Sequence, residues 1–327
     1  MLKKLTILLL LVMAAVFALD YLLYFGLSHN LNLKASYAGQ GKVRAEALVL
    51  GPCEPLFTID PDYLEKKLSC PVYNLSLNHS DFADNYLHFY LFLKSNPAPK
   101  MLLLYVTPES FDLRFNTFHA YRFAPFLADS IVSATIGELD SNYAPWIRLP
   151  LLRYTYFGRM LLFPALQGLK HWNSGKQKPY LSKGYEQHRP AVSPFFDPAR
   201  KSDSLLFDVQ LDEFGNTPED AADKTFIWNA TRETYFVKIM DLARTKGVQV
   251  IVYESPGFSG ILRTQRNRLA FLQKIDSLCN SKGSAYWCFD HLATCGARAN
   301  FISPLMMKSA ASQNFMDTLS LRINKLK

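Results

Sequence analysis

The chain has 327 residues, of which 49% are hydrophobic, and a formal net charge of +8. This apolar content is ample for a folded core, and the sequence contains no low-complexity tract or internal repeat. The positive charge is not gathered on one element with interleaved stacking aromatics. We therefore expect no nucleic-acid partner and attribute the charge to attraction for anionic lipid or polysaccharide at an envelope surface.

The N-terminal segment predicts a membrane anchor. Residues 5–27 are almost entirely apolar, which is long enough for one span of about 20 residues. Two lysines precede this run and place the N-terminus in the cytoplasm, so the bulk of a single-pass inner-membrane protein would be periplasmic. Asp20 falls where the outer headgroups should lie. A cleaved signal peptide is the alternative, with a possible site at 16–18. Because the apolar run continues past that site, we prefer an uncleaved anchor.

The remainder, residues 28–327, reads as one α/β domain. The first strand is predicted at 45–49 and ends in a Gly-Pro loop. Asp60 is a good N-cap for a helix that ends at Leu68. Further strands are predicted at 71–75, 101–106, 248–253 and 285–287, and further helices at 81–94 and 224–246, around 269–275 and at 311–323. Strands that alternate with helices predict a parallel sheet covered on both faces.

The carboxyl ends of parallel strands meet at one edge of the sheet, and ligands bind there in open α/β folds. The sequence places several polar or reactive residues just after predicted strands, and we expect them to line one crevice. The candidate nucleophile is Cys53. The candidate binding residues are Gly51, Glu54, Asn74, Ser76, Thr107 and Glu254.

The α/β pattern lapses from Asp112 to Asp220, in an insertion rich in aromatic residues and arginines. The insertion is too long for a simple connection. We expect helices, which either pack on the edge of the sheet or form a surface that lies on the membrane or on an integral-membrane partner. In the second case the apolar face beside the anchor would comprise Trp146, Leu149, Leu151, Leu152, Phe157 and Leu161.

The motifs at the strand ends resemble those of the SGNH (GDSL-like) hydrolases, especially membrane-anchored bacterial members associated with acylation of envelope polysaccharides. Gly51-Pro-Cys53 stands where that family has Gly-x-Ser, and Asn74-Leu-Ser76 stands where it has Asn-x-Gly. Before the last helix the family has Asp-x-x-His. Here Ser303 stands in the Asp position and Met306 in the His position. The resemblance implies a three-layer, flavodoxin-like α/β fold with degenerate catalytic motifs.

Loss of the histidine matters because a serine or cysteine nucleophile needs a base to remove its proton. Methionine cannot accept a proton, and an ordinary cysteine thiol is mostly protonated at neutral pH. His79 is a weak substitute because it is more simply explained as a solvated loop residue. His291 is weaker still. No cysteine or histidine group has zinc-site spacing, and we expect neither metal nor cofactor.

Two functions remain, beside a purely structural envelope protein in which the crevice has no role. The first is a catalytically degenerate protein that binds an envelope glycan or a membrane acyltransferase. The second is an active esterase or O-acyltransferase that uses Cys53 with an unconventional base. Three changed family positions favour the first. The five cysteines leave at least one unpaired, and Cys288 and Cys295 are near enough in sequence for a local disulfide.

Overall fold

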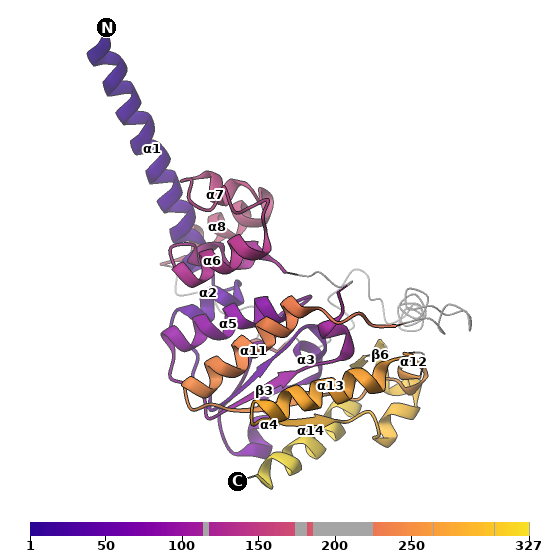
Figure 1. The fold of residues 1–327 in the computed structure, drawn as a ribbon. Coiled ribbons are helices and arrows are strands. Elements are labelled where there is room, and N and C mark those ends of the chain that lie inside the picture. Colours follow the sequence, from indigo (N-terminus) through magenta and orange to yellow (C-terminus); the bar gives the residue numbers. More distant parts are fainter. Residues whose placement is uncertain (114–117, 174–181, 186–224, 264, 304, 327) are drawn as a thin grey trace. The chain divides into compact units, whose positions relative to one another are not determined.

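The computed structural model describes residues 1–113, 118–173, 182–185, 225–263, 265–303 and 305–326. The chain divides into two compact units (Figure 1). The helical unit comprises Met1–Val43, Tyr90–Asn96 and Phe118–Leu181. The sheet unit comprises Arg44–Phe89, Pro97–Thr117 and Ser182–Lys327. Part of the predicted insertion, at 114–117, 174–181 and 186–224, lies outside the described residues.

The sheet unit is built on a five-stranded parallel sheet in the order β2-β1-β3-β4-β5. Its strands are β1 (Ala47–Leu50), β2 (Val72–Asn74), β3 (Met101–Tyr105), β4 (Gln249–Glu254) and β5 (Ala285–Cys288). The chain goes from β1 to one side to form β2 and then returns to the other side to form β3. Parallel pairing and this reversal make the carboxyl ends of β1 and β3 the switch point of the sheet.

Helices surround this sheet. They are α3 (Cys53–Thr58), α4 (Pro61–Leu68), α5 (Phe82–Ser95), α11 (Ala230–Thr245), α12 (Ser259–Leu262), α13 (Arg268–Ser281) and α14 (Ser309–Asn324). Short 3₁₀ turns are η1 (Pro108–Phe111), η3 (Ser182–Gly184), η4 (Ala293–Gly296) and η5 (Arg298–Asn300). A hairpin of β6 (Phe301–Ser303) and β7 (Met306–Met307) precedes α14.

Alternate residues along each strand face opposite sides of the sheet. One face presents Val49, Leu103, Tyr105, Ile251 and Tyr253 to a core that also contains side chains of α4, α14 and the β6–β7 hairpin. On the other face, α11 packs against β4. Helix α11 also contacts α5 through the rings of Phe82 and Phe236, whose centroids are 5.3 Å apart. The predicted parallel sheet with helices on its faces is therefore confirmed.

The helices begin where side-chain caps dictate. Asp60 accepts hydrogen bonds from the N–H groups of the first turn of α4, as predicted. Helix α11 begins later than the sequence pattern predicts, because Asn229 caps it and leaves Ile227 outside and exposed. The helix expected around 269–275 is α13, in which Leu269 is exposed and Phe271, Ile275 and Cys279 form the buried face. Neither α3 nor the β6–β7 hairpin was expected from the sequence.

The helical unit is organised around α1 (Leu2–His29). With it are α2 (Lys34–Gly39), η2 (Ala120–Phe126), α6 (Ser130–Leu139), α7 (Leu152–Thr155), α8 (Arg159–His171) and the last turns of α5. Within the described residues, α1 is the helix long and apolar enough to cross a membrane. Its residues up to Leu19 are exposed apart from Val16, whereas Asp20, Gly26 and Leu27 are buried. Only the second half of α1 therefore packs against protein.

Helix α8 packs along that second half at very short range. A Cβ on Gly26 would lie 2.2 Å from the carbonyl oxygen of Ala165, and a Cβ on Gly168 would lie 1.8 Å from the carbonyl oxygen of Gly26. The backbones can approach this closely only because both positions are glycine. Asn30 continues the contact by donating to the carbonyl oxygen of Pro164 at 2.8 Å. Part of the insertion is thereby attached to the predicted anchor.

The apolar face predicted for the insertion is present in part. Trp146, Leu149 and Leu152 are exposed. Leu151 and Phe157 are half-buried, and Leu161 is buried in the helical unit. Other large apolar side chains add to the exposed surface of this segment: Tyr156, Met160, Phe163, Leu166 and Trp172.

The close approach of α1 and α8 predicts that Gly168→Ala destabilises the protein. The added methyl overlaps backbone atoms, so one helix must shift, at a cost of roughly 1–3 kcal/mol. Gly137→Ala in α6 is the matched control, because a Cβ there meets no atom of the described part of the chain within 4 Å. Thermal unfolding of the full chain in detergent should show a lower Tm for Gly168→Ala and an unchanged or higher Tm for Gly137→Ala. Equal Tm values would contradict the packing.

Candidate functional site

The loop after β1 is held by the loop after β2. The carbonyl oxygen of Gly51 accepts hydrogen bonds from the Leu77 backbone N–H and from the Ser80 hydroxyl, each at 3.0 Å. Gly51 has no room for a side chain, since a Cβ there would lie 2.8 Å from Cβ of Tyr105. Cys53, two residues later, therefore starts α3 from a fixed position at the switch point of the sheet.

Two residues of the turn after β2 contact the Cys53 sulfur. Sγ donates to Oδ1 of Asn78 at 2.7 Å and accepts the backbone N–H of His79 at 3.2 Å. His79 has a positive φ of 49°, and its side chain is exposed. An N–H aimed at the sulfur stabilises a thiolate, and an asparagine amide can present either its oxygen to a thiol or its NH₂ to a thiolate. The hydrogen bond from His79 to the Cys53 sulfur thus comes from the backbone N–H.

Asn74, a predicted binding residue, has a structural role, because its side chain hydrogen-bonds to backbone groups. Its Nδ2 donates to the carbonyl oxygens of Pro55 at 2.7 Å and Ile59 at 3.0 Å, and its Oδ1 accepts the backbone N–H of Ser76. Both amide hydrogens are therefore occupied by the backbone around α3. Asn74 and Ser76 are fully buried. Asn74 fixes α3, and with it Cys53, against the end of β2.

Three carboxyl groups follow strand ends: Glu54 after β1, Glu109 after β3 and Glu254 at the end of β4. Burial, with a smaller contribution from the Glu109 carboxylate, raises the pKa of Glu54 to about 7. Within the described residues, Oε2 of Glu54 and Oε2 of Glu109 are buried and accept no hydrogen bond. The buried Tyr253 hydroxyl is likewise unbonded there, and burial and the Glu54 carboxylate raise its pKa. Three of the buried polar atoms that make no hydrogen bond within the described residues thus belong to residues at the ends of β1, β3 and β4.

Glu254 is the centre of a buried network. Its Oε1 lies 2.9 Å from Nη2 of Arg268, and its Oε2 accepts from the Tyr286 hydroxyl at 3.3 Å. Burial outweighs the guanidinium and raises the pKa of Glu254 to about 7. Arg268 also donates to Gln265, which in turn donates to Oε1 of Glu109 at 2.8 Å. The network thereby links the end of β4 to the loop after β3.

Thr107 is also part of the fold at this edge. It is buried, and its backbone N–H donates to the Ser110 hydroxyl at 3.1 Å, which closes the first turn of η1. The turn places Glu109 beside the network just described. Thr107 therefore orients the loop after β3.

The residues in the predicted Asp and His positions lie on the β6–β7 hairpin. Ser303 and Met306 are opposite each other in the antiparallel pair. Strand β7 packs against α3, the helix that Cys53 begins. Met306 is half-buried and Met307 is buried in the same core as Tyr105 and Tyr253. A thioether thus occupies the strand that lies against the Cys53 helix.

Other sequence expectations concern histidine, cysteine and metal. His291 is exposed in the segment after β5. All five cysteines are free thiols, so the suggested Cys288–Cys295 disulfide is absent. Among the residues that the structure describes, no group of three or more His, Cys, Asp or Glu side chains could hold a metal ion.

Comparison with known proteins gives no further identification: no family model matches the chain, and no curated protein matches its sequence. The site is therefore defined by its geometry alone. Sequence reasoning missed Glu109, Tyr253, Gln265 and Arg268. Glu109 follows a predicted strand and could have been found by the rule that identified Glu254. Arg268 and Gln265 carry no local signal, because only tertiary packing brings them to the strand ends.

Differences in burial predict the order in which the thiols react. Burial raises the pKa of Cys279 to about 12 and that of Cys295 to about 11. Cys53 and Cys70 are half-buried. Iodoacetamide at pH 8 should therefore alkylate Cys53 and Cys70 well before Cys279 and Cys295, because the thiolate is the reactive form. Peptide mass spectrometry over time measures each site. Equal rates at Cys53 and Cys279 would contradict the described environment.

The raised pKa of Glu54 predicts a pH-dependent stability. Between about pH 4.5 and pH 7 the folded protein keeps a proton that the unfolded chain loses, so stability falls as pH rises through this window. Glu54→Gln removes this loss and should be more stable than the parent at pH 8 by roughly 1–3 kcal/mol, with little difference at pH 4.5. Denaturant unfolding in detergent at both pH values measures the difference.

The same pH comparison needs a control, because Glu254 and Asp81 also have raised pKa values, about 7 and about 6, and act in the same direction. Glu46→Gln provides it, since Glu46 is partly exposed and pairs with Lys100 at 2.7 Å. The prediction fails if Glu54→Gln and Glu46→Gln change stability equally at the two pH values.

Proposed function

We propose that this chain is a membrane-anchored, extracytoplasmic protein of the SGNH-hydrolase type that has lost hydrolytic catalysis and binds an envelope glycan or a membrane acyltransferase. The observation that carries the proposal is the position of Met306. It lies on the strand that packs against α3, and α3 begins at Cys53. Where a histidine would have to remove a proton from the nucleophile, the chain has a thioether that cannot accept one.

The sheet supports the same assignment. Its strand order, 2-1-3-4-5, is that of flavodoxin-like sheets, in which ligands bind at the switch point. Cys53 follows the first strand there, as the nucleophile does in SGNH hydrolases. An apolar helix at the N-terminus is compatible with a single-pass anchor. The basic residues before it favour a cytoplasmic N-terminus and a periplasmic sheet unit.

The binding role rests on the polar groups at the same edge. Glu54, Glu109 and Tyr253 have buried oxygens that make no hydrogen bond within the described chain. Glycan hydroxyl groups both donate and accept hydrogen bonds, so they suit a site that contains carboxyl oxygens and a phenol. With a pKa near 7, the Glu54 carboxyl can act either as acceptor or as donor at neutral pH. We therefore place the glycan at the ends of β1, β3 and β4.

A second function is favoured by the surroundings of Cys53 itself. The backbone N–H of His79 points at Sγ, and such a donor stabilises the thiolate that an esterase or O-acyltransferase would use. Acyl transfer through Cys53 would then need a base other than the missing histidine. This is the active alternative that the experiment below distinguishes from the binding protein.

The purified full chain, in nanodiscs, should not hydrolyse p-nitrophenyl acetate faster than its Cys53→Ala variant. Without a base beside the thiol, any residual rate comes from other groups on the surface and survives the substitution. The initial rate across a range of substrate concentrations is the measurement. Saturable turnover that disappears in Cys53→Ala would establish the active alternative and reject the degenerate one.

A further inference from the structure

We propose that the part of the insertion between Tyr143 and Trp172 is a foot that lies in the outer leaflet of the membrane beside α1. The proposal goes beyond the function of the sheet unit and rests only on α1 being a membrane anchor. The foot belongs to the same compact unit as α1. The foot contacts the lipid bilayer itself, and no protein partner is required.

The first argument is the depth of Asp20. At 1.5 Å per residue, the helix from Lys4 to Asp20 is about 24 Å long, whereas the hydrocarbon core of a bilayer is about 30 Å thick. With the Lys4 amine at the inner boundary, the outer boundary falls near Tyr24. Asp20 then lies inside the hydrocarbon, deeper than the headgroup level expected from the sequence, and an unpaired carboxylate is strongly disfavoured there.

The structure pairs this carboxylate with the foot. Oδ1 of Asp20 accepts the backbone N–H of Leu151 at 2.7 Å and Nε–H of Arg153 at 2.9 Å, and Oδ2 pairs with Nη2 of Arg153. The Asp20 side chain is buried by these contacts. A charge neutralised in this way can lie at membrane depth. The same contacts fix residues 151–153 at the level of Asp20, so this part of the foot shares its depth.

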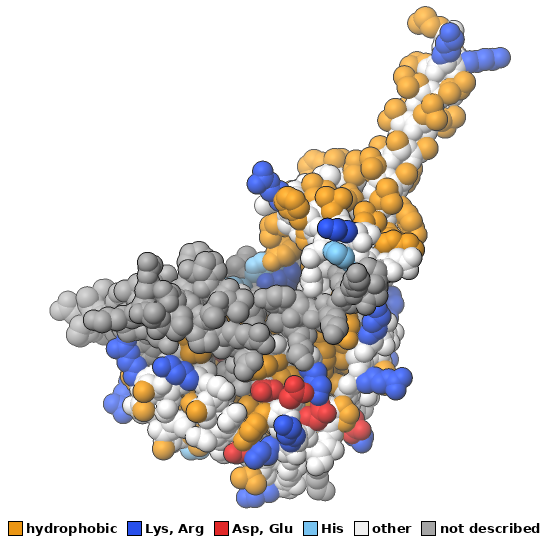
Figure 2. All heavy atoms as spheres, turned by 180° about the vertical axis from the view of Figure 1, so that it is seen from behind, with side chains coloured by type: hydrophobic (Ala, Val, Ile, Leu, Met, Phe, Trp, Pro, Cys, Tyr) orange, Lys and Arg blue, Asp and Glu red, His pale blue; other side chains and the backbone are white. Residues whose placement is uncertain are grey.

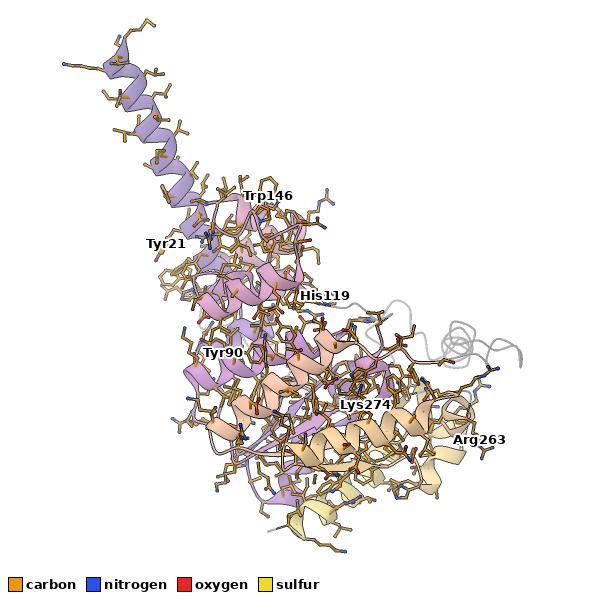
Figure 3. All side chains as sticks on the ribbon, in the orientation of Figure 1. Tyr21, Tyr90, His119, Trp146, Arg263 and Lys274 are labelled. Atoms are coloured by element: carbon orange, nitrogen blue, oxygen red, sulfur yellow. The ribbon has the colours of Figure 1, made fainter. Side chains whose placement is uncertain are left out.

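The outward side chains at this level are apolar. Trp146 is 37% exposed, and Leu149 and Leu152 are each 43% exposed. Figure 3 labels Trp146 at the end of the helical unit from which the free part of α1 emerges, and Tyr21 on α1 itself. In Figure 2, hydrophobic side chains cover the free part of α1 and continue over the neighbouring surface of the helical unit. The apolar surface of the foot is thus continuous with that of the span.

The border residues are those of a membrane interface. Trp172 is exposed and packs edge-on against Phe25, with ring centroids 5.4 Å apart, which places an indole close to the expected outer boundary. Arg148 is exposed between Trp146 and Leu149. Its long side chain can reach the headgroup phosphates while its stem lies along the apolar surface. A lipid leaflet therefore offers acyl chains to the exposed leucines of the foot and phosphate groups to its arginine.

Depth-dependent fluorescence quenching tests this proposal on the full chain in nanodiscs. The variant W172F/W228F/W287F keeps only Trp146. Its emission should fall roughly twofold when the lipid is replaced by one brominated in the upper acyl chain, because the indole would lie in contact with those carbons. The matched control, W146F/W172F/W287F, keeps only Trp228. That indole stacks on Phe111 in the sheet unit, and its emission should not change.

Two outcomes would contradict the proposal that the foot lies in the membrane. If the chain floats with lipid vesicles but Trp146 emission is the same in plain and brominated lipid, the face is exposed to water or reserved for a protein partner. If the full chain does not float with the vesicles, the anchor on which the foot rests is also wrong. Far-UV circular dichroism on each variant verifies that the Trp→Phe changes leave the fold intact. None of these results depends on whether Cys53 is catalytic.

Discussion

The parallel pairing of β1 with β2 on one side and with β3 on the other is the constraint on which the sheet unit depends. It forces the chain to leave β1, β2 and β3 at the same edge. Gly51, without space for a side chain, and Asn74, with both amide hydrogens bonded to carbonyls around α3, then fix the start of α3. The position of Cys53 is thus a consequence of sheet topology.

The same edge holds groups that are costly to bury. Glu54 and Glu109 each have a buried oxygen that makes no hydrogen bond within the described residues, and Glu254 shares Arg268 with Asp290. Buried carboxyls of this kind destabilise a fold and are usually kept for a function. The site therefore combines buried carboxyls at the carboxyl ends of a parallel sheet with a methionine on the strand that packs against α3. The function proposed above, binding without hydrolysis, would account for both observations.

Helix α1 is more than an apolar N-terminal segment. Half of α1 is exposed and apolar, but the other half is a structural helix of the helical unit, joined to α8 through Gly26 and Gly168 and to Arg153 through Asp20. Removing α1 would expose the α8 surface and leave the Arg153 guanidinium without its carboxylate. The natural unit for study is therefore the full chain.

The sequence alone was sufficient for the α/β class, for most strands and for the helix that Asp60 caps. Continuous apolar runs such as 101–105 can only be strands or helices buried on all sides, and caps act within a few residues. Apolar runs and helix caps act over a few neighbouring residues, so they can be recognised in the sequence alone. The common edge at which β1, β3 and β4 end also followed, because parallel strands end on the same side of a sheet.

Tertiary structure decided what depends on distant partners. Arg268 reaches Glu254, the β6–β7 hairpin lies against α3, and Asp20 pairs with Arg153, yet nothing near these residues in sequence indicates the partner. Leu269 and Leu161 show the same limit, since one leucine is exposed and the other buried according to what packs against the helix. Burial and ion pairing are properties of the whole fold, so the short-range pattern of residues could not determine them.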